Sequence, residues 1–456
     1  MTESSEGAHR RWTATDLFIP VIVGLIAVVA CLCAATIGGI SWWAVTYPTP
    51  TPTPTPSPLP TFTLIPTPDR EATDRHLRIL NELWETVRAE YLYPDYNGAD
   101  WDAIGETYRA HVEAGLSDEE FWWAMEDMLL ELNDDHSVFL SPSAAAEEDA
   151  LLAGEWDYVG IGIYSTIPLE IEKEYAVVLL VFPGSPAEQA GLRPHDHMLT
   201  IDGHPACCDE LGYDNMALLE GPIDTTVEMQ VRTPREPIRT VTVIRARIAG
   251  PLPIEKRLLE DGVGYILVPT LWDDTIPERV RRAVEELAAE TTGGELAGLV
   301  LDLRVNAGGS YTTLVGLLEL FTTGEVGRFV SRWDSEPLRV RGVDVAGPQR
   351  VPLVVLVGTE TVSFAEVLAG VLQESGRASV VGRTTLGNIE TTYGYDFEDG
   401  SRAWIAQETF LPPSGADWEE RGIVPDVEIL LDWDEFTVED DPQLEVALEL
   451  LRQNPQ

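Results

Sequence analysis

Basic residues are scarce in this chain of 456 residues. It has 30 lysine and arginine residues against 77 acidic ones, which gives a formal net charge of -47 at pH 7. The phosphates of a nucleic acid would be repelled by such a chain, so we expect no nucleic-acid partner. Lys173 and Lys256 are its only lysines, so none is available for chemistry beyond position 256.

Cysteine is also rare. Of four cysteines, Cys31 and Cys33 lie in an apolar run near the start of the chain, which leaves only the adjacent pair Cys207 and Cys208. No disulfide framework can be read from such a pattern.

Three histidines lie near the cysteine pair, but their spacing fits no zinc pattern. We expect exposed loop side chains at His195, His197 and His204. The sequence therefore predicts neither a metal site nor a cofactor.

The apolar run spans residues 17–45, contains no charge and is long enough to cross a bilayer as a helix. Arg10 and Arg11 precede it, and the next basic residue is Arg70. This asymmetry predicts a cell-membrane protein with one transmembrane helix, a cytoplasmic tail over residues 1–16 and the bulk of the chain outside the cytoplasm. A cleaved signal peptide is the alternative.

The remaining chain divides by composition and periodicity. Residues 46–70 are rich in proline and threonine and predict an extended linker. Residues 71–150 predict helices, one of which begins at the capping box from Ser117 to Glu120. Short strands follow over residues 151–250.

From residue 251 to 433, strands and helices alternate, which predicts an α/β core. Residues 434–456 end the chain with an amphipathic helix. Within the core, "ETVSFAEVLAG" follows an apolar strand and opens a helix. Ser363 and Glu366 form a capping box there, so the serine either caps the helix or does chemistry.

The segment of short strands contains motifs that resemble those of a known domain. "VGIGI", "VFPGSPAEQAGLRPHDHMLTIDG" and "LLEGPIDTTVEMQVR" resemble a PDZ domain of bacterial proteases. The resemblance implies that the loop of Gly160, Ile161, Gly162 and Ile163 holds a peptide carboxylate on its backbone N–H groups. The alternative is that the glycines only shape a hairpin.

A second resemblance covers the chain from about residue 71 to its end. "GLVLDLRVNAGG", "TVSFAEVLAGVLQESGRASVVG", "TTLGN", "FEDGSRAWIA" and "WEERGIVPD" occur in the order of the carboxy-terminal processing peptidases, or tail-specific proteases. The resemblance implies a crotonase-like α/β core and a nucleophile at Ser363. It also implies an oxyanion site at the N–H groups of Gly309 and Phe364.

The general base departs from the family pattern. The family's lysine falls on Asn388, and an amide has no useful basicity. "LNDDHS" is similar to the turn that bears the catalytic histidine of tricorn-type relatives, which makes His136 the candidate base. Glu419 matches their supporting glutamate, whereas Asp135 replaces their serine beside the histidine.

Taken together, we expect a multidomain α/β protein with a helical N-terminal region, a PDZ-like β domain, a serine protease core and one N-terminal transmembrane helix. The predicted function is a membrane-anchored extracytoplasmic serine endopeptidase, which recognises the C-terminal tails of protein or peptide substrates and cleaves through Ser363 and His136. The alternative is an inactive relative that only binds protein tails.

Overall fold

The computed structural model describes residues 69–134, 136–155, 157–168, 173–207, 215–343, 347, 349–419 and 421–453. Across these residues, no helix combines the length and the apolar character that crossing a bilayer requires. The longest of them, α2 (Arg70–Glu90), has charged residues along its whole length.

The predicted fold is therefore corrected: a single N-terminal transmembrane helix is not supported. Residues 17–45, for which that helix was predicted, lie outside the described part, as do the tail over residues 1–16 and most of the linker. The extracytoplasmic location stays a prediction.

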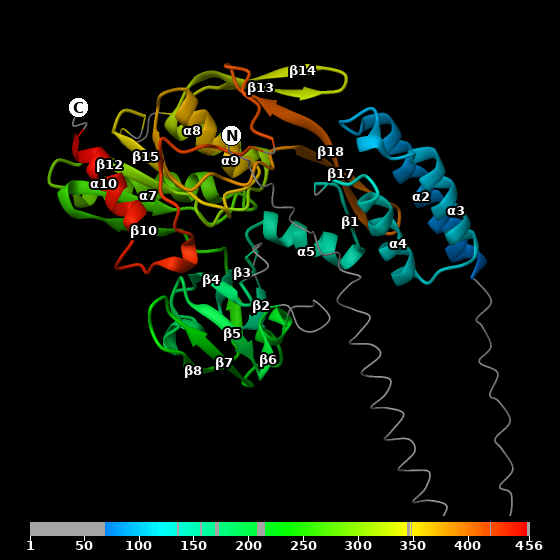
Figure 1. The fold of residues 1–456 in the computed structure, drawn as a ribbon, viewed down its shortest axis with the longest axis horizontal. Coiled ribbons are helices and arrows are strands. Elements are labelled where there is room, and N and C mark those ends of the chain that lie inside the picture. The colour runs from blue at the N-terminus through cyan, green and yellow to red at the C-terminus, as the bar shows by residue number, and fades with distance from the viewer. Residues whose placement is uncertain are drawn as a thin grey trace, which may run out of the picture. The chain divides into compact units, whose positions relative to one another are not determined.

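Three helices form the N-terminal part of the described chain and pack around a common apolar core. They are α2, α3 (Trp101–Glu113) and α4 (Asp118–Leu130), with the short η1 (Tyr96–Gly98) between the first two. The predicted capping box at the start of α4 is confirmed, because Ser117 and Glu120 exchange both of its hydrogen bonds. Figure 1 shows these helices beside the strands β1, β17 and β18.

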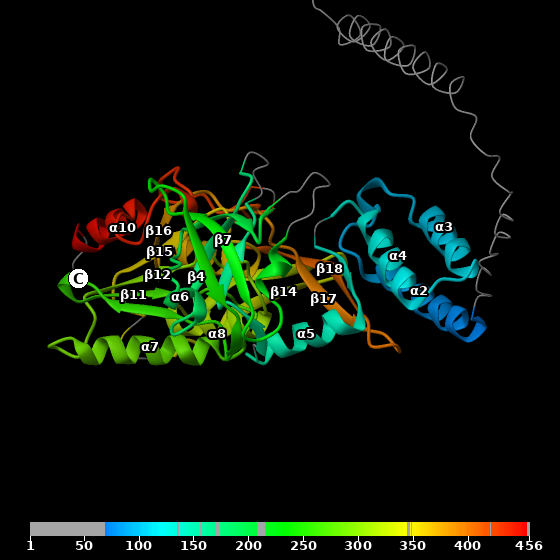
Figure 2. The same ribbon diagram turned by 90° about the horizontal axis from the view of Figure 1, so that it is seen from below.

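A six-stranded sheet forms the centre of the α/β core. Its order is β10-β11-β12-β15-β16-β19, in which only β10 runs antiparallel to its neighbour. Figure 2 shows it between α7 and α8 on one side and α10 on the other. The strands are β10 (Glu255–Leu258), β11 (Val263–Leu267), β12 (Gly298–Asp302), β15 (Leu353–Val357), β16 (Ser379–Gly382) and β19 (Val427–Glu428).

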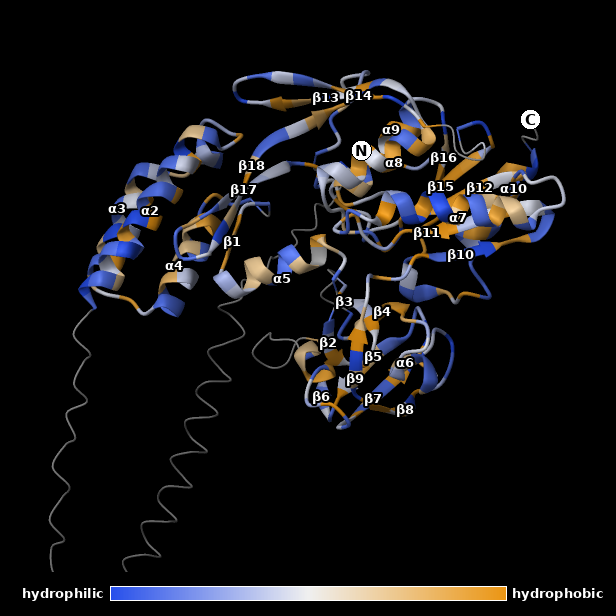
Figure 3. Cartoon of the chain, turned by 180° about the vertical axis from the view of Figure 1, so that it is seen from behind, coloured by the Kyte–Doolittle hydropathy of each residue, from blue (hydrophilic) through white to orange (hydrophobic). Residues whose placement is uncertain are grey.

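The central strands β11, β12 and β15 are buried at every position, because both faces of this largely parallel sheet are covered. The orange colouring of Figure 3 marks hydrophobic residues along the central strands of this sheet. One face packs against three helices and the other against the C-terminal helix and β4. The helices are α7 (Ile276–Glu290), α8 (Tyr311–Phe321), α9 (Phe364–Glu374) and α10 (Pro442–Gln453).

An antiparallel sheet joins the helical part to this core. Strand β18 pairs with β1, β13 and β17, while β13 also pairs with β14. The helices pack against Ala403, Ile405 and Ala406 of β18. Its strands are β1 (Val138–Leu140), β13 (Gly324–Ser331), β14 (Ser335–Val340), β17 (Thr391–Asp396) and β18 (Arg402–Leu411).

The strand-rich segment follows α5 (Pro142–Leu152) and forms a separate small sheet of order β3-β4-β5-β7-β8, with β2 and β9 paired beside it. The strands are β2 (Asp157–Gly160), β3 (Ile163–Thr166), β4 (Ala176–Val181), β5 (His197–Ile201), β6 (His204–Pro205), β7 (Thr226–Arg232), β8 (Arg239–Ile244) and β9 (Ala246–Ala249). Its helical turns are α6 (Pro186–Gln189) and η2 (Met216–Leu219).

Two of the histidines expected to be exposed are buried, so that prediction is wrong for them. His195 stacks on Trp433 at 4.0 Å between ring centroids, and its Nδ1 lies 2.5 Å from the Trp433 carbonyl oxygen. His197 Nε2 lies 2.7 Å from the Asp434 carbonyl oxygen. Both therefore attach the strand-rich segment to η4 (Trp433–Glu435). His204 is exposed, as predicted.

Candidate active site

Ser363 lies at a strained turn between β15 and α9. Its φ of 57° and ψ of -130° are rare for a residue with a Cβ atom, and such backbone strain costs about 1–3 kcal/mol. The predicted capping box is present at the start of α9, where Ser363 and Glu366 exchange both of its hydrogen bonds. The Glu366 amide also donates to the Ser363 carbonyl oxygen (2.9 Å). Such strain is typical of a nucleophile placed at a strand-to-helix turn.

Glu366 connects this helix to the loop that contains Asn388. One carboxylate oxygen accepts hydrogen bonds from the Ser363 N–H (3.1 Å) and the Asn388 N–H (2.9 Å). The other accepts from the Gly387 N–H (2.7 Å) and from the Thr385 hydroxyl. Burial raises the pKa of Glu366, and these donors oppose the rise. The Asn388 backbone is thereby held close to the start of α9.

Two glycines bring a second loop against Ser363. Gly308 and Gly309 have φ values of 84° and 153°. A Cβ atom on Gly308 would lie 2.6 Å from the Ser363 Cβ, and one on Gly309 would lie 1.9 Å from the Leu271 carbonyl carbon. The Leu271 N–H donates to the Gly308 carbonyl oxygen (2.7 Å) and thereby fixes the loop.

Ser363, Phe364 and Gly309 line one cavity of about 440 Å³. Among the described residues, no hydrogen bond uses the N–H of Gly309 or of Phe364. The cavity therefore combines a hydroxyl with two available backbone donors. Its other lining residues include aromatic side chains and the carboxylates of Glu336, Glu390 and Glu408.

His136 is held by the turn that follows α4. Asp134 accepts hydrogen bonds from the N–H of His136 (3.0 Å), the N–H of Ser137 (2.6 Å) and the Tyr91 hydroxyl (2.5 Å). The Ser137 hydroxyl in turn accepts from the Ala406 N–H of β18 (3.2 Å). These hydrogen bonds fix the turn that contains His136 against strand β18 of the antiparallel sheet. Asp135 lies outside the described residues.

The imidazole of His136 lies against two carboxylates. Its Nε2 is 3.4 Å from Glu419 Oε1 and 3.7 Å from Glu390 Oε2. The second oxygen of Glu419 accepts from the Ile389 N–H (2.9 Å), and Glu390 Oε1 accepts from the Tyr93 hydroxyl. Burial raises the pKa of Glu390 to about 7, although His136 and Tyr93 act in the opposite direction.

The structure therefore groups the predicted site residues into two neighbouring sets. Gly309, Ser363 and Phe364 share the cavity, whereas His136 and Glu419 form a cluster. Glu390 belongs to both, because it lines the cavity and also lies against the imidazole.

Glu390 was missed from the sequence. Its local signal is a single acidic residue between Ile389 and the start of β17, in a loop that the family motif already marks. Tyr93, which donates to it, precedes it by 297 positions, so no local pattern connects the two.

The predicted tail-binding loop, Gly160 to Ile163, belongs to neither set and is part of the strand-rich segment. Ile161 and Ile163 line a separate cavity of about 610 Å³, together with Tyr158 and with Met216 and Leu219 from η2. A Cβ atom on Gly162 would lie 2.5 Å from the Ser185 Cβ, so the loop requires glycine there.

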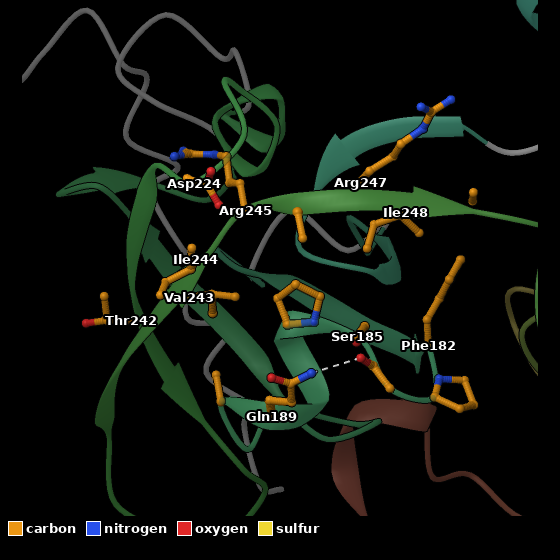
Figure 4. Close-up of a pocket in the computed structure, with 16 residues that line it drawn as sticks. Phe182, Ser185, Gln189, Asp224, Thr242, Val243, Ile244, Arg245, Arg247 and Ile248 are labelled. Atoms are coloured by element: carbon orange, nitrogen blue, oxygen red, sulfur yellow. Dashed lines mark hydrogen bonds between the residues drawn. The ribbon is translucent and has the colours of Figure 1, made fainter.

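A further cavity of the strand-rich segment contains none of the predicted residues. Figure 4 shows it between α6 and the edge formed by β8 and β9. Gln189 Nε2 donates to the Gly184 carbonyl oxygen (3.0 Å) at its margin. Phe182, Ile244 and Ile248 supply apolar surface.

Comparisons with known proteins indicate one family of peptidases. The model of Peptidase family S41 matches residues 262–429, and that of the Tricorn protease C1 domain matches residues 74–130. The C-terminal processing peptidase of Tetradesmus obliquus chloroplasts is 30% identical over 384 residues, which cover 79% of each chain. The carboxyl-terminal-processing protease of Synechocystis sp. is 28% identical over 395 residues, 84% of this chain and 89% of the relative.

Among solved structures, the photosystem II D1 C-terminal processing protease matches 78% of this chain and 93% of its own length. The TM-score is 0.56 and the sequence identity 28%. The fold and these relatives define the class of the protein as a serine-type peptidase. Within that class, the chain belongs to the C-terminal processing peptidase family, which confirms the family predicted from its motifs.

Proposed function

We propose that this protein is an active serine endopeptidase with Ser363 as its nucleophile. The observation that carries the proposal is the cavity in which a strained serine meets the unused N–H groups of Gly309 and Phe364. Two such donors stabilise the oxyanion that forms when a hydroxyl attacks a peptide carbonyl. Water then hydrolyses the acyl-enzyme.

His136 is the proposed general base. A neutral imidazole is well matched to taking the proton of Ser363 near neutral pH and returning it to the leaving amine. Glu419 and Glu390 lie within 3.4 and 3.7 Å of its Nε2, so both favour the imidazolium that forms during attack. This arrangement accounts for activity without the lysine that Asn388 replaces.

The strand-rich segment is the proposed PDZ-like part, and it captures polypeptide tails. The Gly160–Ile163 loop borders a cavity with Ile161 and Ile163 in its wall, which favours an apolar C-terminal side chain. Cleavage and tail capture then take place in separate cavities of the same chain.

A fluorophosphonate probe tests the nucleophile and its base. We expect labelling of the wild-type protein, and its loss in Ser363→Ala and in His136→Ala. Ser310→Ala is the matched control, because Ser310 lines the same cavity but caps α8, and this variant should remain labelled. A wild-type protein that resists labelling would contradict the proposal.

The second candidate function is tail binding without hydrolysis, and the asparagine at position 388 favours it. Absence of labelling, combined with binding of tail peptides to the wild-type protein, would support this function instead.

A further inference from the structure

The cluster of His136, Glu390 and Glu419 has the composition of a metal site. One potential ligand atom from each residue lies within 4.8 Å of the other two. A zinc ion binds histidine nitrogen and carboxylate oxygen at about 2.0–2.2 Å, which places tetrahedral ligand atoms about 3.4 Å apart. The distances from His136 Nε2, 3.4 and 3.7 Å, are close to that spacing.

Each carboxylate has one oxygen fixed and the other turned to the imidazole. Glu419 Oε2 accepts from the Ile389 N–H, and Glu390 Oε1 accepts from the Tyr93 hydroxyl. Donors of this kind orient carboxylate ligands in metal sites. They leave Glu419 Oε1 and Glu390 Oε2 to face His136 Nε2.

Glu390 Oε2 supplies an independent indication of a ligand. The side chain is only 3% exposed, and this oxygen is buried without a hydrogen-bond partner among the described residues. An unpaired buried carboxylate oxygen is costly. Glu419 places a second carboxylate beside it.

We propose that His136, Glu390 and Glu419 bind a divalent transition-metal ion of the Zn²⁺ type, and that the bound ion inhibits the peptidase. Imidazole with carboxylates suits Zn²⁺, whereas Mg²⁺ and Ca²⁺ prefer oxygen ligands alone. The ion occupies Nε2 of His136 and so removes the base. The inhibition rests on the proposed function, but the binding does not.

Calorimetric titration of Zn²⁺ into metal-free Ser363→Ala protein tests the binding without any need for activity. We expect one strong site per chain, and no comparable site for Mg²⁺. Adding Glu390→Gln or Glu419→Gln to this protein should weaken the affinity for Zn²⁺ by roughly tenfold or more. Glu336→Gln is the matched control, because Glu336 lines the cavity outside the cluster, and it should leave the affinity unchanged.

Two further readouts complete the test. Thermal melting identifies a variant that fails to fold. If one of the two glutamine variants does not fold, the other is sufficient for the binding test. In the wild-type protein, Zn²⁺ should slow peptide hydrolysis and a chelator should restore it. Absence of a strong site, or a site that survives both variants, would overturn the proposal. A protein that binds Zn²⁺ but lacks fluorophosphonate labelling would instead refute the proposed peptidase function alone.

Discussion

At the scale of single residues, the contact between Gly309 and Leu271 determines whether the proposed oxyanion site forms. The Ser310 N–H donates to the Leu271 carbonyl oxygen (2.9 Å), and the Leu271 N–H donates to that of Gly308. These paired backbones leave no room for a side chain at Gly309. The Gly309 N–H is consequently positioned by backbone packing rather than by a side chain.

Gly309→Ala should strongly slow the labelling of Ser363 by a fluorophosphonate. The new Cβ would lie 1.9 Å from the Leu271 carbonyl carbon and 2.2 Å from the Trp272 nitrogen, backbone atoms that cannot rotate away. Displacement of the loop removes one oxyanion donor, so we expect a labelling rate about 100-fold lower. The rate is measured on protein that remains folded by circular dichroism.

Gly376→Ala is the control for this substitution. Gly376 also has a positive φ, 68°, but a Cβ atom there meets nothing within 4 Å. The Gly376→Ala substitution should cost only about 1 kcal/mol of stability and leave the labelling of Ser363 unchanged. Equal labelling of the two variants would show that the Gly309 loop does not position the oxyanion donor.

At the scale of elements, strand β2 places Tyr158 where a peptide carboxylate is proposed to bind. Burial raises the pKa of Tyr158 to about 12, and the nearby amides of Gly162 and Ile163 oppose the rise. Tyr158 also lines the cavity that contains Ile161 and Ile163. Its hydroxyl therefore competes with a peptide tail for the same amides.

Tyr158→Phe should strengthen the binding of tail peptides. Removal of one polar group that competes for these amides is worth about 1 kcal/mol, or roughly fivefold in affinity. Fluorescence anisotropy with a labelled peptide that ends in a free carboxylate measures the gain. The same peptide with an amidated C-terminus should gain nothing. An equal gain for both peptides would refute the proposed role of the loop.

The attachment of the strand-rich segment to η4 should be sensitive to acid. Burial lowers the pKa of His195 from its usual 6.5 to about 4, and Arg304 acts in the same direction, whereas Asp441, Asp302 and the Trp433 carbonyl oppose it. Neutral His195 is thus favoured in the folded state. Its contribution to stability is complete above pH 6.5 and is lost as the pH falls from 6.5 towards 4.

His195→Asn should reduce the acid destabilisation that wild-type protein shows in thermal melting. Because a shift of one pKa unit corresponds to 1.36 kcal/mol, protonation of His195 accounts for roughly 3 kcal/mol at most. His204→Asn is the control, since His204 is exposed. His197 is a second contributor, and burial lowers its pKa as well. Identical pH dependence in the wild-type protein and in His195→Asn would contradict this explanation.

Local elements could be predicted from the sequence because their causes are local. The capping box at Ser117 and Glu120 spans three residues, and the apolar periodicity of α2 lies within one helix. Burial of His76 could not be predicted, because its Nε2 reaches Asp118 (2.8 Å), 42 positions away, and its ring stacks on Phe121. The partners of His195 and His197 lie over 200 positions away.

The same distinction applies to the site. Motifs with fixed spacing identified Ser363, Gly309 and Glu419 as candidates, and their catalytic roles stay predictions. The contact between Glu390 and His136 joins a loop of the core to the turn after α4, so it can be recognised only in the folded chain.

At the scale of the whole molecule, charge should select substrates. The chain has a formal net charge of -47, and three glutamates line the proposed catalytic cavity without a lysine, arginine or histidine among its described lining residues. Aromatic rings of Trp272, Tyr393 and Trp404 line it too. Carboxylates and aromatic faces both attract cationic side chains.

Peptides with lysine or arginine near the cleaved bond should therefore have higher kcat/KM than glutamate-containing peptides of equal length. Added salt screens charges beyond roughly 10 Å, so it should reduce this preference. The double variant Glu336→Gln, Glu408→Gln should reduce it by roughly threefold or more, because it removes two charges of the cavity itself. Glu449→Gln on α10, which supplies no cavity residue, changes net charge without this effect. If Glu449→Gln lowers the preference as much as the double variant does, selection depends on the net charge of the chain and not on the cavity.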